Sequence, residues 1–68
     1  MTFTALMQMV IHDQQVRLRI IESDDVITGM AETLDNYVCV ELAQAEVVEI
    51  NAENGVLNVW VKNYLQCH

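Results

Sequence analysis

The chain contains no proline, two glycines and two cysteines in 68 residues. It also has no stretch rich in proline or serine, no internal repeat and no low-complexity tract. These absences exclude a linker between two domains. The sequence therefore predicts a single domain over residues 1–68.

The chain has too few cysteines and histidines for a disulfide framework or a metal site. Cys39 and Cys67 show no CxxC spacing, and His12 and His68 are the only imidazoles. This pattern excludes a disulfide framework and predicts no metal site and no cofactor. We expect Cys39 to be a small core residue and Cys67 to have no special role. A metal site formed by Cys67 and His68 is the alternative.

Basic residues are scarce: three stand against ten acidic ones, for a net charge of −7. This charge opposes generic binding to phosphate backbones, so any nucleic-acid site must be local. The three cations, Arg17, Arg19 and Lys62, would have to be gathered in one place. Repetition around a symmetric ring is one way to do so.

Long apolar runs are absent as well. No run approaches the roughly 20 residues that a membrane span needs, and no basic segment precedes the first apolar residues as in a signal peptide. We therefore expect a cytoplasmic protein, of a cell or of a virus within one, that has no membrane partner.

Hydrophobic residues, in contrast, make up 53% of the chain. A fold of this length buries only about 60% of the surface that its unfolded chain exposes. The apolar content therefore exceeds what one small core can hide. Self-association is the simplest explanation.

The hydrophobic pattern predicts one helix followed by strands. Thr2 can cap a helix of about ten residues whose apolar stripe is Phe3, Leu6, Met7, Val10 and Ile11. Residues 16–20 then alternate, which predicts a strand with Arg17 and Arg19 on its outer face.

Further strands are expected after a hairpin turn at 22–25. The predicted strands cover 26–34, 37–50, 56–61 and 64–67. Gly29 would bend the first of these, and Asp35 and Asn36 would form the turn after it. The segment 43–50 could instead be a helical turn, and we favour strand. Asn54 and Gly55 suit the positive φ of a turn within 51–55.

Catalytic motifs are absent from the chain. It has no GxSxG, HExxH, P-loop or GxGxxG pattern. Asp24 and Asp25 are adjacent carboxylates, but they lie on a predicted turn where such acids are usually solvated. A chain this short with few long loops also has little room for a deep pocket. We therefore expect no enzymatic activity.

Two predicted strand ends carry side chains suited to single-stranded RNA. Asn36 and Tyr37 stand at one of them, and Lys62 and Asn63 at the other. An aromatic face, amides and a cation can stack on a base, bond its edge and meet a phosphate. The alternative is that Tyr37 is a core or interface aromatic and Asn36 an ordinary turn residue.

These motifs resemble those of the Sm/LSm family and its bacterial branch, Hfq. The first motif matches residues 16–20, then 26–30 with its central glycine, then 34–38 with the sequence LDNYV. The second matches Val61-Lys62-Asn63, where Hfq has histidine in place of Asn63. Cys39 stands where eukaryotic members have asparagine. The resemblance covers residues 3–65.

The resemblance implies a mainly β fold, an SH3-like barrel of five bent antiparallel strands after one short N-terminal helix. It further implies a homo-oligomeric ring of about five to seven subunits. Asn36, Tyr37, Lys62 and Asn63 would line its pore and bind short, uridine-rich RNA in RNA processing or regulation. The alternative is an acidic module on the same barrel that binds a basic protein instead of RNA.

Overall fold

The structure is a computed structural model that describes residues 1–62. Its helices are α1 (Phe3–Met7), α2 (Ala31–Tyr37) and α3 (Val40–Ala43). Its strands are β1 (Gln15–Ile20), β2 (Asp25–Met30), β3 (Glu46–Glu53) and β4 (Val56–Lys62). The fold is mainly β, as predicted.

The four strands form one open, mixed sheet in the order β2-β1-β4-β3. β1 with β2 and β3 with β4 are antiparallel pairs, whereas β1 and β4 run parallel. The expected uniformly antiparallel arrangement is therefore wrong, and a closed five-stranded barrel is not seen in the described residues. The strand predicted over 64–67 lies outside those residues.

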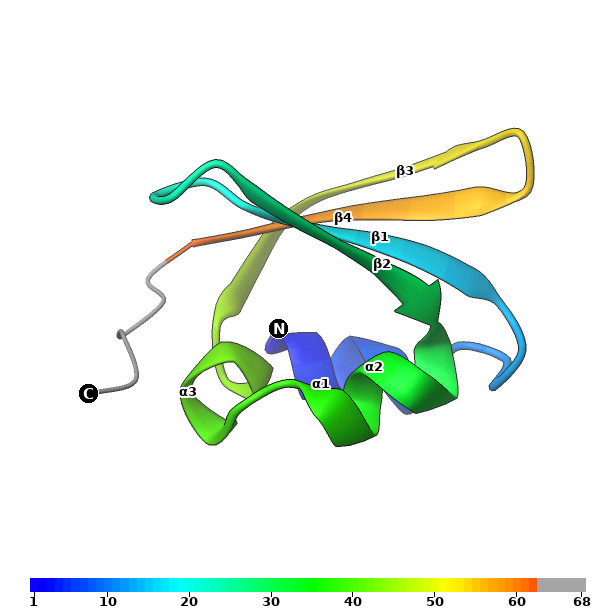
Figure 1. The fold of residues 1–68 in the computed structure, drawn as a ribbon, viewed down its shortest axis with the longest axis horizontal. Coiled ribbons are helices and arrows are strands. Elements are labelled where there is room, and N and C mark those ends of the chain that lie inside the picture. Colours follow the sequence, from blue (N-terminus) through cyan, green and yellow to red (C-terminus); the bar gives the residue numbers. More distant parts are fainter. Residues whose placement is uncertain (63–68) are drawn as a thin grey trace.

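The three short helices lie together on one side of the sheet (Figure 1). α1 begins as predicted, because the Thr2 hydroxyl accepts a hydrogen bond from the amide of Ala5 at 3.2 Å. The helix is shorter than expected and ends at Met7. Val10 still packs against the core beyond the helix, but Ile11 is exposed.

The β1–β2 hairpin follows the sequence pattern. Val16, Leu18 and Ile20 are buried, and the alternating residues point away from the core. Asp24, in the turn, has a φ of 60°. The β3–β4 hairpin also turns at positive φ, with 53° at Asn54 and 78° at Gly55, which confirms the predicted conformation. The turn is shorter than predicted, because β3 extends to Glu53.

The sequence predicts the end of one strand, a turn and the start of another over residues 31–43. The structure has α2 and α3 there instead. Ala31 and Leu34 are spaced for one helix face, and both are buried. Asp35 and Asn36 lie within α2, where the Asn36 side chain donates to the Glu32 carbonyl at 3.0 Å. Asp35 and Asn36, which were predicted to form a turn, therefore lie on a helix.

Gly29 does not produce the predicted interruption of its strand. A Cβ atom at this position would lie 3.4 Å from Cδ2 of Leu34, which is ordinary van der Waals contact. Leu34 of α2 thus packs directly over Gly29 of β2. Gly29 keeps its place in the regular pairing with Val16.

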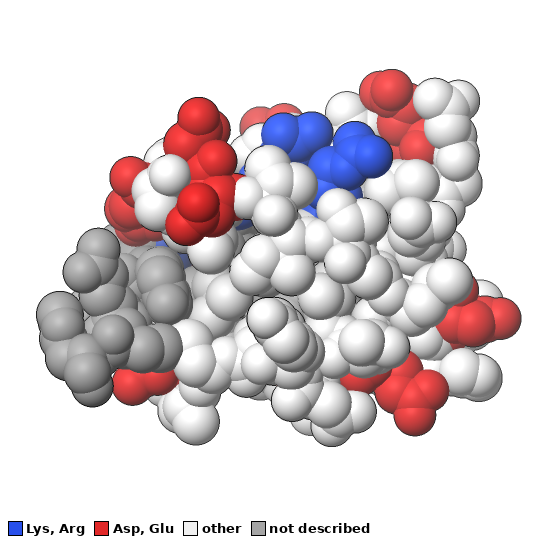
Figure 2. All heavy atoms as spheres, viewed as in Figure 1, with Lys and Arg blue, Asp and Glu red and all other residues white. Residues whose placement is uncertain are grey.

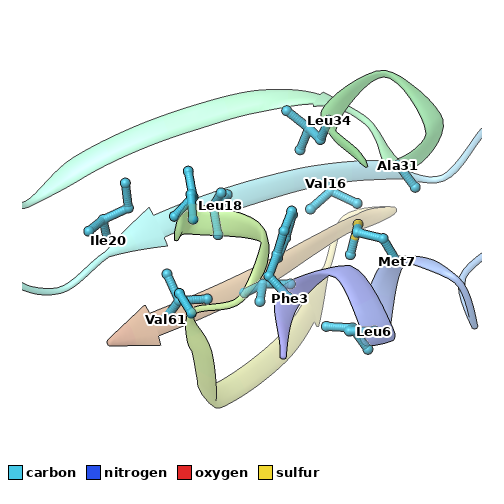
Figure 3. Close-up of a cluster of buried hydrophobic side chains, with 12 residues drawn as sticks. Phe3, Leu6, Met7, Val16, Leu18, Ile20, Ala31, Leu34 and Val61 are labelled. Atoms are coloured by element: carbon cyan, nitrogen blue, oxygen red, sulfur yellow. The ribbon is translucent and has the colours of Figure 1, made fainter. Parts of the chain in front are cut away.

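One hydrophobic core joins the helices to the inner face of the sheet. Figure 3 shows Phe3, Leu6 and Met7 of α1 in one cluster with buried side chains of the strands. A hydrogen bond of 3.0 Å from the Thr4 hydroxyl to Asp35 connects α1 with α2. None of the helices within residues 1–62 is long and apolar enough to cross a membrane.

Leu34→Ala tests this placement of α2. The variant should lose about 2–5 kcal/mol of unfolding free energy, because Leu34 is fully buried and its removal leaves a cavity. Tyr37→Ala is the control on the same helix, since Tyr37 is 74% exposed, and it should change stability by less than about 0.5 kcal/mol. Urea denaturation followed by circular dichroism measures both, and equal losses would contradict this packing.

Candidate functional site

The sheet has one face that no described helix covers, here called the open face. Alternation along the strands and the pairing register assign its residues. The open face consists of Gln15, Arg17, Arg19, Val26, Thr28, Met30, Glu46, Glu49, Asn51, Glu53, Val56, Asn58, Trp60 and Lys62.

All three basic residues of the chain lie on the open face. Arg17 and Arg19 come from β1, as predicted, and Lys62 from the end of β4. Figure 2 shows basic atoms between two groups of acidic atoms. The parallel pairing of β1 with β4 thus gathers the few cations within one chain, without a ring.

The only tryptophan, Trp60, lies on the same face. Together with Arg17, Arg19 and Lys62 it forms what is here called the cluster. Trp60 is the register partner of Arg19, and the Arg19 guanidinium carbon lies 5.5 Å from the centre of the indole ring. A cation at this distance is attracted by the ring face. Both side chains are half-buried, and Nε of Arg19 is buried without a hydrogen-bond partner. The pair thus places a cation and an aromatic ring side by side.

The arginines are free of carboxylates among residues 1–62. The one ion pair found there joins Lys62 to Glu46 at 3.8 Å, at the exposed end of β4. Ten acidic residues are present, so two arginines without an acidic partner are unexpected in this chain. Their donors can therefore bind an anionic ligand.

Asn58 lies in the middle of the open face, opposite Arg17 on one side and Asn51 on the other. Only 7% of it is exposed, and its Oδ1 atom is buried without a hydrogen-bond partner. An unpaired buried acceptor costs about 1–3 kcal/mol. A polar group kept at that cost is a candidate for ligand recognition.

Acidic residues border the cluster on both sides. Glu49 and Glu53 of β3 share the open face, and Glu22, Asp24 and Asp25 lie at the β1–β2 turn. These charges repel a phosphate chain that extends beyond the cations. The basic surface is therefore narrow.

The structure does not bring the predicted RNA-binding residues together in one site. Asn36 and Tyr37 are exposed on α2, in the helical layer, whereas Lys62 lies on the opposite, open face of the sheet. Asn63 lies outside the described residues. Of the three described residues, Lys62 alone belongs to the cluster around Trp60, and one chain does not bring it together with Tyr37.

No pocket is found in the part of the chain that the structure describes, and no group of acidic, histidine and cysteine side chains there could hold a metal ion. No family model matches the chain, and neither curated proteins nor solved structures gave a match. The candidate site thus depends on the geometry of the open face alone.

The variant Asn58→Val tests whether the side-chain amide of Asn58 lowers the free energy of unfolding. Valine suits a strand and removes the unpaired Oδ1, so the variant should gain about 1 kcal/mol of unfolding free energy. Urea denaturation gives the difference. A loss of stability would show instead that the amide is satisfied in the folded protein.

Proposed function

We propose that the protein binds short single-stranded RNA on the open face of its sheet. One observation carries the proposal: every cation and the only tryptophan of an acidic chain lie on the one face that the described helices leave uncovered. Cations for phosphates beside an aromatic surface for bases are the usual components of single-strand recognition.

Each group has a distinct role in this proposal. The Arg19–Trp60 pair offers a surface on which a base stacks, a contact worth about 1–3 kcal/mol. Arg17, two residues along β1, meets a phosphate with donors that no described carboxylate occupies. Asn58 of β4, which lies beside Arg17, reaches a base edge once a bound base displaces the side chains that cover it.

The acidic border sets the length of the ligand. Two arginines and one paired lysine neutralise about two or three phosphates, so affinity should fall only moderately with salt. A longer strand would meet Glu22 or Glu53 and gain little. The proposed ligand is therefore a segment of a few nucleotides.

The finer features implied by the Sm/LSm resemblance stay predictions. These are the closed five-stranded barrel, the ring and the pore formed by Asn36, Tyr37, Lys62 and Asn63. The lack of catalysis and the cytoplasmic location, which were expected from motifs and segments that the sequence lacks, also stay predictions. The motif over 34–38 that suggested the resemblance forms mainly helix rather than a strand and turn. Binding on the open face requires neither the barrel nor the ring.

Oligonucleotide binding by variants of the two candidate sites tests the proposal. Arg17→Ala and Trp60→Ala should each weaken binding of a labelled oligo-uridine by about tenfold, because each removes a phosphate or stacking contact. Fluorescence anisotropy measures the affinity, and quenching of Trp60, the sole tryptophan, reports contact in the unmodified chain.

Tyr37→Ala and Asn36→Ala are the controls on the helical layer, and both should bind like the unmodified protein. The reverse result, in which Tyr37→Ala weakens binding and Arg17→Ala does not, would favour the pore site. Absence of RNA binding together with recovery of a basic protein would support the acidic interaction module.

A further inference from the structure

The two outer strands of the sheet differ in how their free edges are protected. At the start of β3, the amide of Val47 donates to the Met1 carbonyl at 2.8 Å, and Thr2 bridges Glu46. The register of β3 shifts between Val47 and Glu49, and the strand contains three glutamate residues. A covered start, an irregularity and charges are devices that block edge pairing.

β2 has almost none of these devices. Its register with β1 is uninterrupted from Asp25 to Met30, and its only charged residue is the first one. Among the described residues β2 pairs with β1 alone. An unprotected edge of this kind is a template for another strand.

The backbone groups at this edge can be assigned. The amide of Ala31 donates to the Gln14 carbonyl at 2.8 Å, next to the pair formed by Gln15 and Met30. Hydrogen-bonded and non-hydrogen-bonded pairs alternate along an antiparallel ladder. Asp25, Ile27 and Gly29 therefore bond β1, whereas Val26 and Thr28 direct their amides and carbonyls away from the sheet. Met30 directs its amide the same way, but its carbonyl accepts the first hydrogen bond of α2, for which Met30 is the N-cap.

The same three residues carry side chains that fit each other. Val26 and Met30 are 49% and 46% exposed, and Thr28 lies between them on the open face. In an antiparallel pair centred on Thr28, each Val26 would lie opposite a Met30, and the two threonines would lie opposite each other. Apolar pairs and threonine pairs stabilise such ladders.

We propose that β2 is the interface for a second copy of this chain. Two copies pair their β2 strands antiparallel about a twofold axis at Thr28, which closes both edges in an isologous contact. Asp25 then lies opposite the partner subunit's Ala31, so no two acidic residues of β2 lie directly opposite each other. A ring would need the protected β3 edge, which this geometry does not favour.

The proposal is independent of RNA binding, and Thr28→Pro tests it. Proline removes the Thr28 amide, which in the single chain bonds nothing in the sheet, so the fold should persist while dimerisation weakens at least about tenfold. Analytical ultracentrifugation over a range of concentrations measures the dissociation constant, and circular dichroism checks the fold. Thr28→Ala is the matched control, because it keeps the amide and should still dimerise.

Amide hydrogen exchange in the unmodified protein tests the interface even if the proline variant does not fold. Exchange at Val26, Thr28 and Met30 should slow as protein concentration rises, whereas exchange at exposed amides of α2 should not. A monomer at all accessible concentrations, an assembly other than a dimer, or concentration-independent exchange at these amides would each overturn the proposal.

Discussion

The parallel pairing of β1 with β4 is the contact on which the rest of the structure depends. It joins two hairpins that are far apart in sequence into one sheet. On the inner face it places Leu18 beside Val59 and Ile20 beside Val61, which the helices cover. On the outer face it places Arg19 against Trp60. The core and the candidate site are thus two sides of the same pairing.

The elements that were predicted correctly have strong local signals. A threonine at the helix start, alternation over 16–20 and the Asn54-Gly55 pair each specify a local conformation without help from distant residues. The prediction for residues 31–43 was wrong because the alternating apolar residues of this segment fit either a strand or short helices. Its helical state depends on burying Leu34 and Leu42 against the sheet, which the sequence alone does not display.

The candidate site was predictable only in part for the same reason. The outward direction of Arg17 and Arg19 followed from alternation, but their neighbours depend on a pairing over a long sequence separation. Trp60 and Asn58 therefore had no local signal that linked them to the arginines. Tyr37 was predicted to bind RNA because it is an aromatic beside an amide, but the helix that carries it belongs to the other layer of the fold.

The position of β4 also has a consequence for synthesis of the protein on the ribosome. A growing chain can form the β1–β2 hairpin before β4, the parallel partner of β1, has been synthesised. Contacts of such high sequence separation form slowly, because the loop must close before they contribute. Until then Val16, Leu18 and Ile20 lack their β4 neighbours Leu57, Val59 and Val61. A nascent chain that has not yet reached β4 therefore cannot complete its core.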